Sequence, residues 1–241
     1  MSPRTRIGKL VAKLCSDGLK KVTLELGGNC PFLIFDDADL HQALVGMCFP
    51  PRVRQSPVTD EVVGLMALKW RHAGQACITA NRVYVQSGIY DKFAAMLKEA
   101  TAKLVVGHGA DKNTTMGPVT TPRSLDKALN QVEDAKKHGG QIILGGGKVL
   151  GTSGYFFEPT IILGAKKEML ITEEETFAPV LALYSFETEE EAVAAANNTS
   201  MGLASYFFTK NVDRTWRLLE NLEAGMIGMN TGQFHDRMRS L

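Results

Sequence analysis

One cysteine in a loop of small residues is the strongest candidate for chemistry in this chain. Cys77 lies within Gly-Gln-Ala-Cys-Ile-Thr-Ala-Asn-Arg, residues 74–82. Only a thiolate attacks efficiently, and a free cysteine has a pKa of about 8.5, so the loop must help the thiol to ionise. Backbone N–H groups of such a loop would stabilise the thiolate and a later oxyanion. These residue types indicate covalent thiol catalysis.

A carboxylate upstream supplies a partner for that thiol. Glu25 stands in Leu-Glu-Leu-Gly-Gly, residues 24–28, near the end of an apolar run that predicts a strand over 22–26. Beside Cys77, it would activate a water molecule against a thioester. The two residues alone leave a plainer interpretation open, which is a buried structural cysteine and an ion-paired glutamate.

The composition argues against several classes of partner. The 241 residues carry 27 basic and 26 acidic side chains, for a net charge of +1, which disfavours nucleic acid or an acidic membrane as the main partner. No apolar run long enough to span a membrane and no secretory leader are visible, so we expect a soluble protein of the cytoplasm or mitochondrion that is not secreted. The four cysteines lack Cys-x-x-Cys spacing and the five histidines are scattered. We therefore expect reduced thiols and no metal site.

The elements that must position these residues alternate between strands and helices, which favours an α/β fold. Periodicity and turn signals predict strands over 31–35, 82–86, 179–186, 203–209 and 226–229, and helices over 65–70, 89–105, 122–139 and 213–222. Thr121 before a proline is a typical helix start, and Thr188 with Glu191 forms a capping box for a further short helix. Three glycines before Lys148 lack phosphate-loop spacing and indicate a plain turn.

Five motifs, in order along residues 6–230, resemble those of the aldehyde dehydrogenase superfamily. They are the two segments around Glu25 and Cys77, then Phe-Glu-Pro-Thr at 157–160, Glu-Glu-Glu-Thr-Phe-Ala-Pro-Val at 173–180, and Gly-Met-Ile-Gly-Met-Asn at 225–230. The resemblance implies an α/β fold with the three layers of an aldehyde dehydrogenase catalytic domain, the cofactor domain being largely missing. It also implies NAD(P)-dependent oxidation of a small aldehyde, with NAD or NADP as cofactor, in a family whose members form homo-oligomers.

The resemblance assigns roles to individual residues. Cys77 matches the nucleophile that forms a thioester, and Glu25 matches the base that hydrolyses it. Glu175 matches the glutamate that holds the nicotinamide ribose, and Phe177 matches the aromatic residue beside the nicotinamide. An acidic helix start and a core phenylalanine would look the same as the last two residues, and that alternative stays open.

One arginine indicates the chemical class of the substrate. Lys-Trp-Arg-His-Ala-Gly-Gln at 69–75 resembles the succinate-semialdehyde dehydrogenase branch, whose arginine six positions before the cysteine binds the substrate carboxylate. Arg71 occupies that position, and a guanidinium suits a carboxylate because its planar fork makes two hydrogen bonds. The alternative is a surface arginine at the carboxyl end of a helix.

Three departures from the family define the expected domains. Residues 1–26 are expected to be a remnant of the cofactor-binding domain, residues 27–232 the catalytic domain, and residues 233–241 an atypical tail. Within the catalytic domain, residues 46–63 look like an insertion, because removing them restores a helical pattern and they contain prolines that a helix excludes. We hypothesise that this segment is a retained, in-frame intron. The alternative function is then an inactive truncated fragment that binds no cofactor.

Overall fold

The computed structural model describes residues 3–45, 64–151 and 153–232. Within these ranges one seven-stranded sheet has the order β3-β4-β5-β2-β1-β6-β7. All neighbouring strands run parallel except β3 and β4. The strands are β1 Cys30–Ile34, β2 Ala80–Gln86, β3 Gln141–Leu144, β4 Thr160–Leu163, β5 Val180–Phe186, β6 Ala204–Phe208 and β7 Met226–Met229. The expected α/β class is confirmed.

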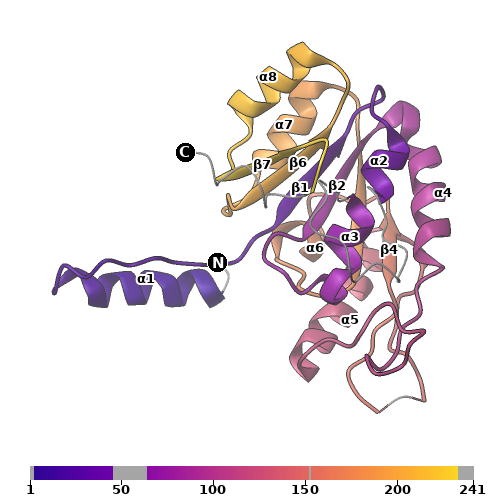
Figure 1. The fold of residues 1–241 in the computed structure, drawn as a ribbon, viewed down its shortest axis with the longest axis horizontal. Helices are drawn as coiled ribbons and strands as arrows, with labels where there is room; N and C mark the ends of the chain where they lie inside the picture. The colour runs from indigo at the N-terminus through magenta and orange to yellow at the C-terminus, as the bar shows by residue number, and fades with distance from the viewer. Residues whose placement is uncertain (1–2, 46–63, 152, 233–241) are drawn as a thin grey trace.

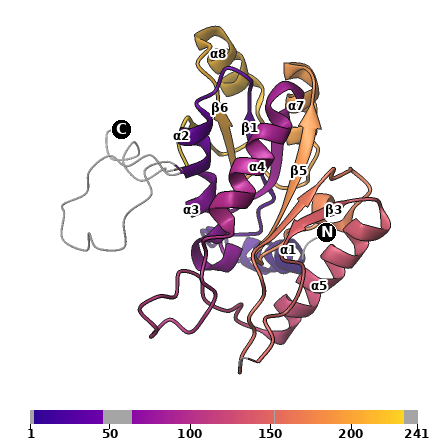
Figure 2. The ribbon, with the colours of Figure 1, turned by 90° about the vertical axis from the view of Figure 1, so that its right-hand side faces the viewer.

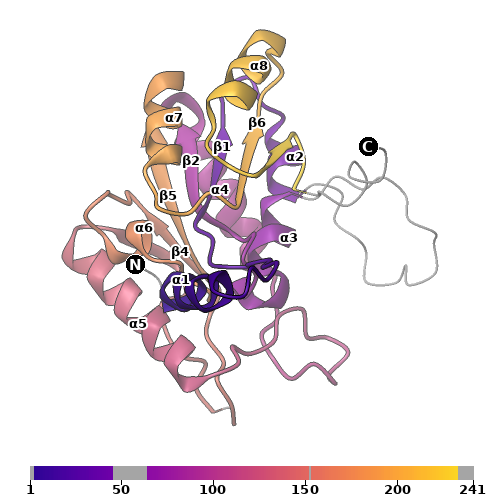
Figure 3. The ribbon, with the colours of Figure 1, turned by 90° about the vertical axis from the view of Figure 1, so that its left-hand side faces the viewer.

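The helices cover both faces of the sheet. The helices of the described residues are α1 Pro3–Ser16, α2 Leu40–Val45, α3 Leu65–Trp70, α4 Tyr90–Thr101, α5 Pro122–Lys137, α6 Leu170–Glu173, α7 Glu189–Asn197 and α8 Val212–Asn221, with short 3₁₀ turns at Arg71–Gly74 and Ser87–Ile89. Figures 1 to 3 show α2, α3 and α4 on one face and α7 and α8 on the other. The expected three layers are therefore confirmed.

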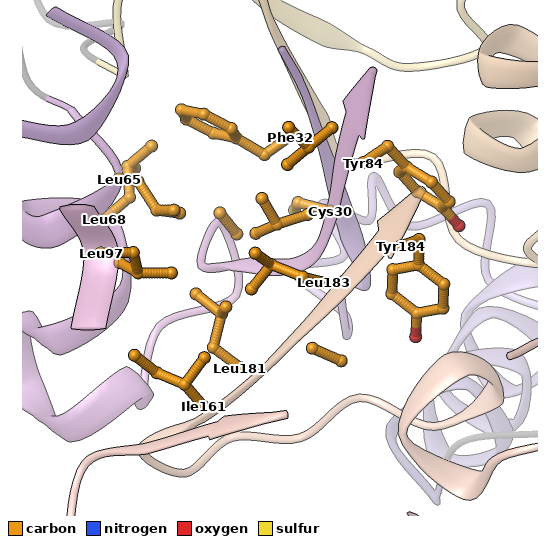
Figure 4. Packing of buried hydrophobic residues seen from close by; sticks show 14 of the residues in the cluster. Cys30, Phe32, Leu65, Leu68, Tyr84, Leu97, Ile161, Leu181, Leu183 and Tyr184 are labelled. Atoms are coloured by element: carbon orange, nitrogen blue, oxygen red, sulfur yellow. The ribbon is translucent and has the colours of Figure 1, made fainter. Parts of the chain in front are cut away.

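The core follows from the central strands, which are apolar on both faces. Every residue of β1 and β6 is buried, as expected for parallel strands covered by helices on both sides. Figure 4 shows Leu65, Leu68 and Leu97 of the α3–α4 layer on one side of the sheet, with Tyr84 and Tyr184 on the other. The centroids of the two tyrosine rings lie 4.8 Å apart, so the rings pack against each other on this side of the sheet.

The predicted strand over 22–26 is wrong. Residues 20–29 are extended but pair with no strand in the described parts of the chain. The stretch returns alongside α1, which projects from the body of the molecule (Figure 1). There Leu26 fits against Gly8, where a side chain would come within 2.8 Å of it. Leu26 of this run therefore packs on a helix instead of on a neighbouring strand, while Leu24 is exposed.

Polar contacts close the carboxyl-terminal edge of the sheet. Asp37, after β1, accepts from the Thr209 hydroxyl at 2.8 Å and pairs with Arg214 at 2.9 Å. Asn230, after β7, accepts from the Thr209 N–H at 3.0 Å and donates to its carbonyl at 2.9 Å. The loops that follow β1, β6 and β7 are thereby joined into one cluster.

Helices α2 and α3 lie end to end, with α3 continuing below α2 (Figures 1 and 2). The predicted insertion at 46–63, like the tail at 233–241, lies outside the described residues. The buried face of α2 carries Ala43 and Leu44, and that of α3 carries Leu65, Leu68 and Lys69. Without residues 46–63, Leu44 and Leu65 would stand three positions apart, so the two buried faces would form one helical stripe.

Deleting residues 46–63 should therefore stabilise the protein. In general, closing a chain of eighteen residues between two helices costs about 2 kcal/mol more than continuing one helix, since closure entropy grows slowly with chain length. Urea unfolding should show a higher midpoint for the deletion variant. A variant in which the same residues are replaced by a Gly/Ser linker of equal length is the control and should show no gain. A lower midpoint for the deletion variant would show that α2 and α3 are not two parts of one helix.

Candidate active site

The segments predicted to carry the site meet at one edge of the sheet because each precedes a strand. Residues 27–28 lead into β1, the cysteine loop leads into β2, and the loop of Glu175 leads into β5. These strands are parallel neighbours in the order β5-β2-β1, so their amino-terminal ends lie together. Ligands of open parallel sheets usually bind at the carboxyl-terminal edge. Here the predicted residues gather at the opposite edge.

Two glycines make the closest contacts among these segments. The Gly28 N–H donates to Glu175 Oε1 at 3.0 Å, and a side chain on Gly27 would lie 2.9 Å from the other carboxylate oxygen. A side chain on Gly28 would collide with the Cys77 carbonyl. Only residues without a side chain allow the chain to pass between Cys77 and Glu175.

Contacts from Gly28 and from helix α5 hold Glu175 in place. Its side chain is buried, with 8% of its surface exposed. Lys127, on α5, donates to the Glu175 carbonyl at 2.6 Å and pairs with the Glu174 carboxylate at 3.1 Å. Helix α5 therefore fixes the backbone that presents the Glu175 carboxylate to Gly28.

The cysteine loop begins in strained backbone. His72, Ala73 and Gly74 take φ values of 56°, 52° and 72°, and a non-glycine residue in this left-handed region costs about 1–2 kcal/mol. Gly74 also lies against the Ala178 carbonyl, where a side chain would collide. This left-handed backbone turns the chain sharply after α3, so that the half-buried Cys77 reaches the sheet edge.

A buried lysine closes the base of this loop. Lys69 is fully buried and donates to the Asn81 side-chain oxygen at 2.9 Å. Its Nζ would lie 3.4 Å from a side chain on Gly74, so it stands between the beginning and the end of the loop. Burial lowers the pKa of Lys69 to about 7. The sequence analysis did not select this residue, although a lysine on the apolar stripe of α3 was the available signal.

A buried arginine anchors the strand that follows the loop. Arg82, fully buried at the start of β2, donates to the Asn29 carbonyl at 2.9 Å and to the carbonyls of Ala195 and Ala196, both at 2.8 Å. The last two belong to the carboxyl-terminal turn of α7, where carbonyls lack helical partners and carry partial negative charge. One side chain thereby connects the stretch before β1, the cysteine strand and the opposite layer.

The remaining predicted residues lie on the same segments but make fewer contacts. Glu25 and Arg71 are exposed, Glu25 in the extended stretch before Gly28 and Arg71 directly after α3. Within the described residues, neither Glu25 nor Arg71 makes a hydrogen bond or ion pair with Cys77. Phe177 is half-buried and has a left-handed φ of 50°. The structure thus brings Cys77, Gly28 and Glu175 together directly, and Glu25 only through the glycines.

In ranges 3–45, 64–151 and 153–232, no group of three or more His, Cys, Asp or Glu side chains is arranged to hold a metal ion. None of the helices in the described part is long and apolar enough to cross a membrane.

Comparisons with known proteins identify the family of this chain. The family described as the aldehyde dehydrogenase family matches residues 3–50 and 57–239. The NADP(+) succinate-semialdehyde dehydrogenase 1 of Schizosaccharomyces pombe is 44% identical over 96% of this chain and 43% of that protein. The glutarate-semialdehyde dehydrogenase of Pseudomonas putida is 42% identical over 95% of this chain and 43% of its own length. The crystal structure of succinate-semialdehyde dehydrogenase from Burkholderia pseudomallei matches with a TM-score of 0.85 at 39% identity, over 95% of this chain and 44% of that one.

The fold and the site therefore define an α/β protein with a candidate thiol nucleophile at the amino-terminal edge of its sheet. The chain belongs to the aldehyde dehydrogenase family, as the motifs around Cys77 and Glu175 predicted. It spans less than half the length of the curated relatives that it matches.

The buried Lys69 makes stability depend on pH. Its pKa is lowered in the folded protein to about 7 and is ordinary, 10.5, when exposed, so between these values the unfolded chain binds more protons. The free energy of unfolding should therefore rise with pH across this window, by up to about 1.4 kcal/mol per pH unit from this group. Denaturant titrations from pH 7 to 10 measure the slope, and Lys69→Met should flatten it. Lys98→Met, at an exposed position of α4, is the control and should leave the slope unchanged. A wild-type slope equal to that of Lys69→Met would contradict the assignment.

Proposed function

We propose that the protein oxidises an aldehyde to its acid through a thioester on Cys77, with NAD or NADP as the hydride acceptor. The observation that carries this proposal is the contact of Gly28 with both the Cys77 carbonyl and the Glu175 carboxylate. It supports the proposal because the segments that carry Cys77, Glu25 and Glu175 lie at one edge of the sheet. We take residues 27–232 as the catalytic domain and residues 1–26 as part of the cofactor-binding domain.

Each residue has one task in this proposal. The Cys77 thiolate adds to the aldehyde carbon, and backbone N–H groups of its loop stabilise the resulting oxyanion. Once the thioester has formed, Glu25 takes a proton from water as the water attacks the thioester carbon. The sulfur then leaves as thiolate and the acid is released, which restores Cys77 for another cycle.

The side chains present carry chemical groups suited to a nicotinamide cofactor. A bound nicotinamide supplies the acceptor for the hydride that leaves the substrate carbon. Glu175 offers a buried carboxylate, the acceptor that ribose hydroxyls require, and Phe177 adds an apolar ring two residues further along the same loop. The relative from Schizosaccharomyces pombe carries NADP(+) in its name, which supports this class of cofactor for the present chain.

The substrate is proposed to carry an acid group, with succinate semialdehyde as the first choice. Succinate and glutarate semialdehydes, the compounds in the names of two relatives, both carry a carboxylate. Arg71 is exposed and stands six residues before Cys77, so its guanidinium is available to hold such a group by two hydrogen bonds. Homo-oligomer formation, as in the family, belongs to the same proposal.

Turnover of succinate semialdehyde with NAD⁺ or NADP⁺ tests the reaction. We expect reduced nicotinamide to form with the wild-type chain and Cys77→Ser to abolish it, because a serine hydroxyl is a far weaker nucleophile at neutral pH. Cys15→Ser, on the projecting helix, is the matched control and should keep full activity. Calorimetric titration with each cofactor separates the alternatives: neither turnover nor cofactor binding by the wild-type chain would support an inactive fragment.

Replacing Arg71 tests the substrate class. Arg71→Gln should lower kcat/KM for succinate semialdehyde by about 10- to 100-fold, since a hydrogen-bonded ion contact contributes about 1.5–3 kcal/mol. Butanal, which has the same carbon number and no carboxylate, should be oxidised equally well by both forms. Equal losses for the two aldehydes would mean that Arg71 supports the loop and does not bind the acid group.

A further inference from the structure

Two successive carbonyls of the cysteine loop are held by buried side chains from the sheet. The Cys30 thiol, at the start of β1, donates to the Cys77 carbonyl with a sulfur–oxygen distance of 3.4 Å. The Tyr206 hydroxyl, from β6, donates to the Ile78 carbonyl at 2.8 Å. Because peptide groups are planar and trans, a carbonyl turned towards the sheet directs the N–H of the same peptide away from it. These two bonds therefore fix the orientation of the peptides that follow the nucleophile.

The Tyr206 ring has little freedom to move. Tyr206 is fully buried, and its register partner on β7 is Gly228. A side chain on Gly228 would come within 2.8 Å of the ring, so the missing side chain makes the space that the ring fills. On the other neighbouring strand, the Phe32 ring lies 5.9 Å away. Burial also raises the pKa of Tyr206, so its hydroxyl stays protonated and able to donate.

We propose that Tyr206 is a positioning residue for the nucleophile, acting through the Ile78 carbonyl to fix the peptides of the cysteine loop. The inference rests on the proposed role of Cys77. Loss of the hydroxyl leaves the Ile78 carbonyl without its sheet partner and lets the peptide rotate. The N–H of the same peptide, that of Thr79, donates to the Ala76 carbonyl at 3.1 Å, so rotation of this peptide also breaks the turn over residues 76–79 that carries Cys77.

The variant Tyr206→Phe removes only the hydroxyl and keeps the ring. Tyr90→Phe is the matched control, since the Tyr90 hydroxyl also donates to a backbone carbonyl, that of Leu183, at 3.2 Å, and its other bond is to the Gly164 N–H, outside the cysteine loop. Alkylation of Cys77 by iodoacetamide is followed from pH 5 to 10 by peptide mass spectrometry, which separates Cys77 from the other cysteines. Amide hydrogen exchange of the peptide spanning residues 75–80 is measured in parallel on the same proteins.

For Tyr206→Phe we expect alkylation of Cys77 at pH 7 to slow by about 3- to 10-fold, because the reactive thiolate depends on a fixed loop around it. Exchange of the loop peptide should become about tenfold faster. The control should match the wild type in both measurements. A general loss of stability would lower the melting temperatures of both variants without slowing the alkylation of Cys77.

The proposal is overturned if Tyr206→Phe matches Tyr90→Phe in both loop exchange and the alkylation profile. If wild-type Cys77 is alkylated no faster at pH 7 than Cys15, activation of Cys77 in the proposed function fails, and loop exchange alone then decides the role of Tyr206. Should Tyr206→Phe fail to fold, Cys30→Ala removes the bond to the neighbouring carbonyl and is compared with Cys15→Ala. Equal loop exchange in that pair would also overturn the proposal.

Discussion

The guanidinium of Arg82 is the interaction on which the rest of this structure depends. It is fully buried, and its hydrogen bonds go to the carbonyls of Asn29, Ala195 and Ala196 and to the Tyr84 hydroxyl. A buried charge is costly unless hydrogen bonds replace its water. The carboxyl-terminal turn of α7 supplies such carbonyls, and their partial charge is of the favourable sign. Because Asn29 follows Gly28 directly, the same side chain fixes the glycines between Cys77 and Glu175.

Parallel order then explains why residues far apart in sequence form one site. The segments before β1, β2 and β5 meet only because these three strands are adjacent and point the same way. Space is made by glycines at 27, 28 and 74, and each stands where a side chain would strike a neighbouring segment. The left-handed backbone at His72 and Phe177 is strained, and it persists because the surrounding contacts determine the path of the chain.

Local signals in the sequence predicted most of the fold. The helix after Thr121 begins as expected, with the Thr121 hydroxyl accepting from the Ser124 N–H at 3.2 Å. The capping box also forms in part: Glu191 donates its N–H to Thr188, but its carboxylate accepts from Glu187 instead. The strand over 226–229 has the predicted bounds. These features depend on neighbours within a few residues, so a pattern in the chain suffices to predict them.

Long-range contacts were harder to predict. The run at 22–26 has the alternation of a strand, yet a strand needs a partner, and the chain places α1 beside it instead. The bond from Gly28 to Glu175 joins residues 147 positions apart, and no local pattern encodes it. Lys69 and Tyr206 were missed for the same reason, since their roles come from what lies across the sheet. The motifs around Cys77 and Glu175 were predicted through family resemblance, which carries long-range information that periodicity lacks.

The polar contacts at the carboxyl-terminal edge make the two edges of the sheet different. Asp37, Thr209, Arg214 and Asn230 join the loops after β1, β6 and β7 by hydrogen bonds and one ion pair. That edge, where parallel sheets usually offer their crevice, works here as a brace that holds the strands in register. The two edges therefore limit which residues fit there for different physical reasons. A change at the brace removes contacts between the loops after β1, β6 and β7, whereas a side chain added at Gly28 or Gly74 meets the backbone of a neighbouring segment.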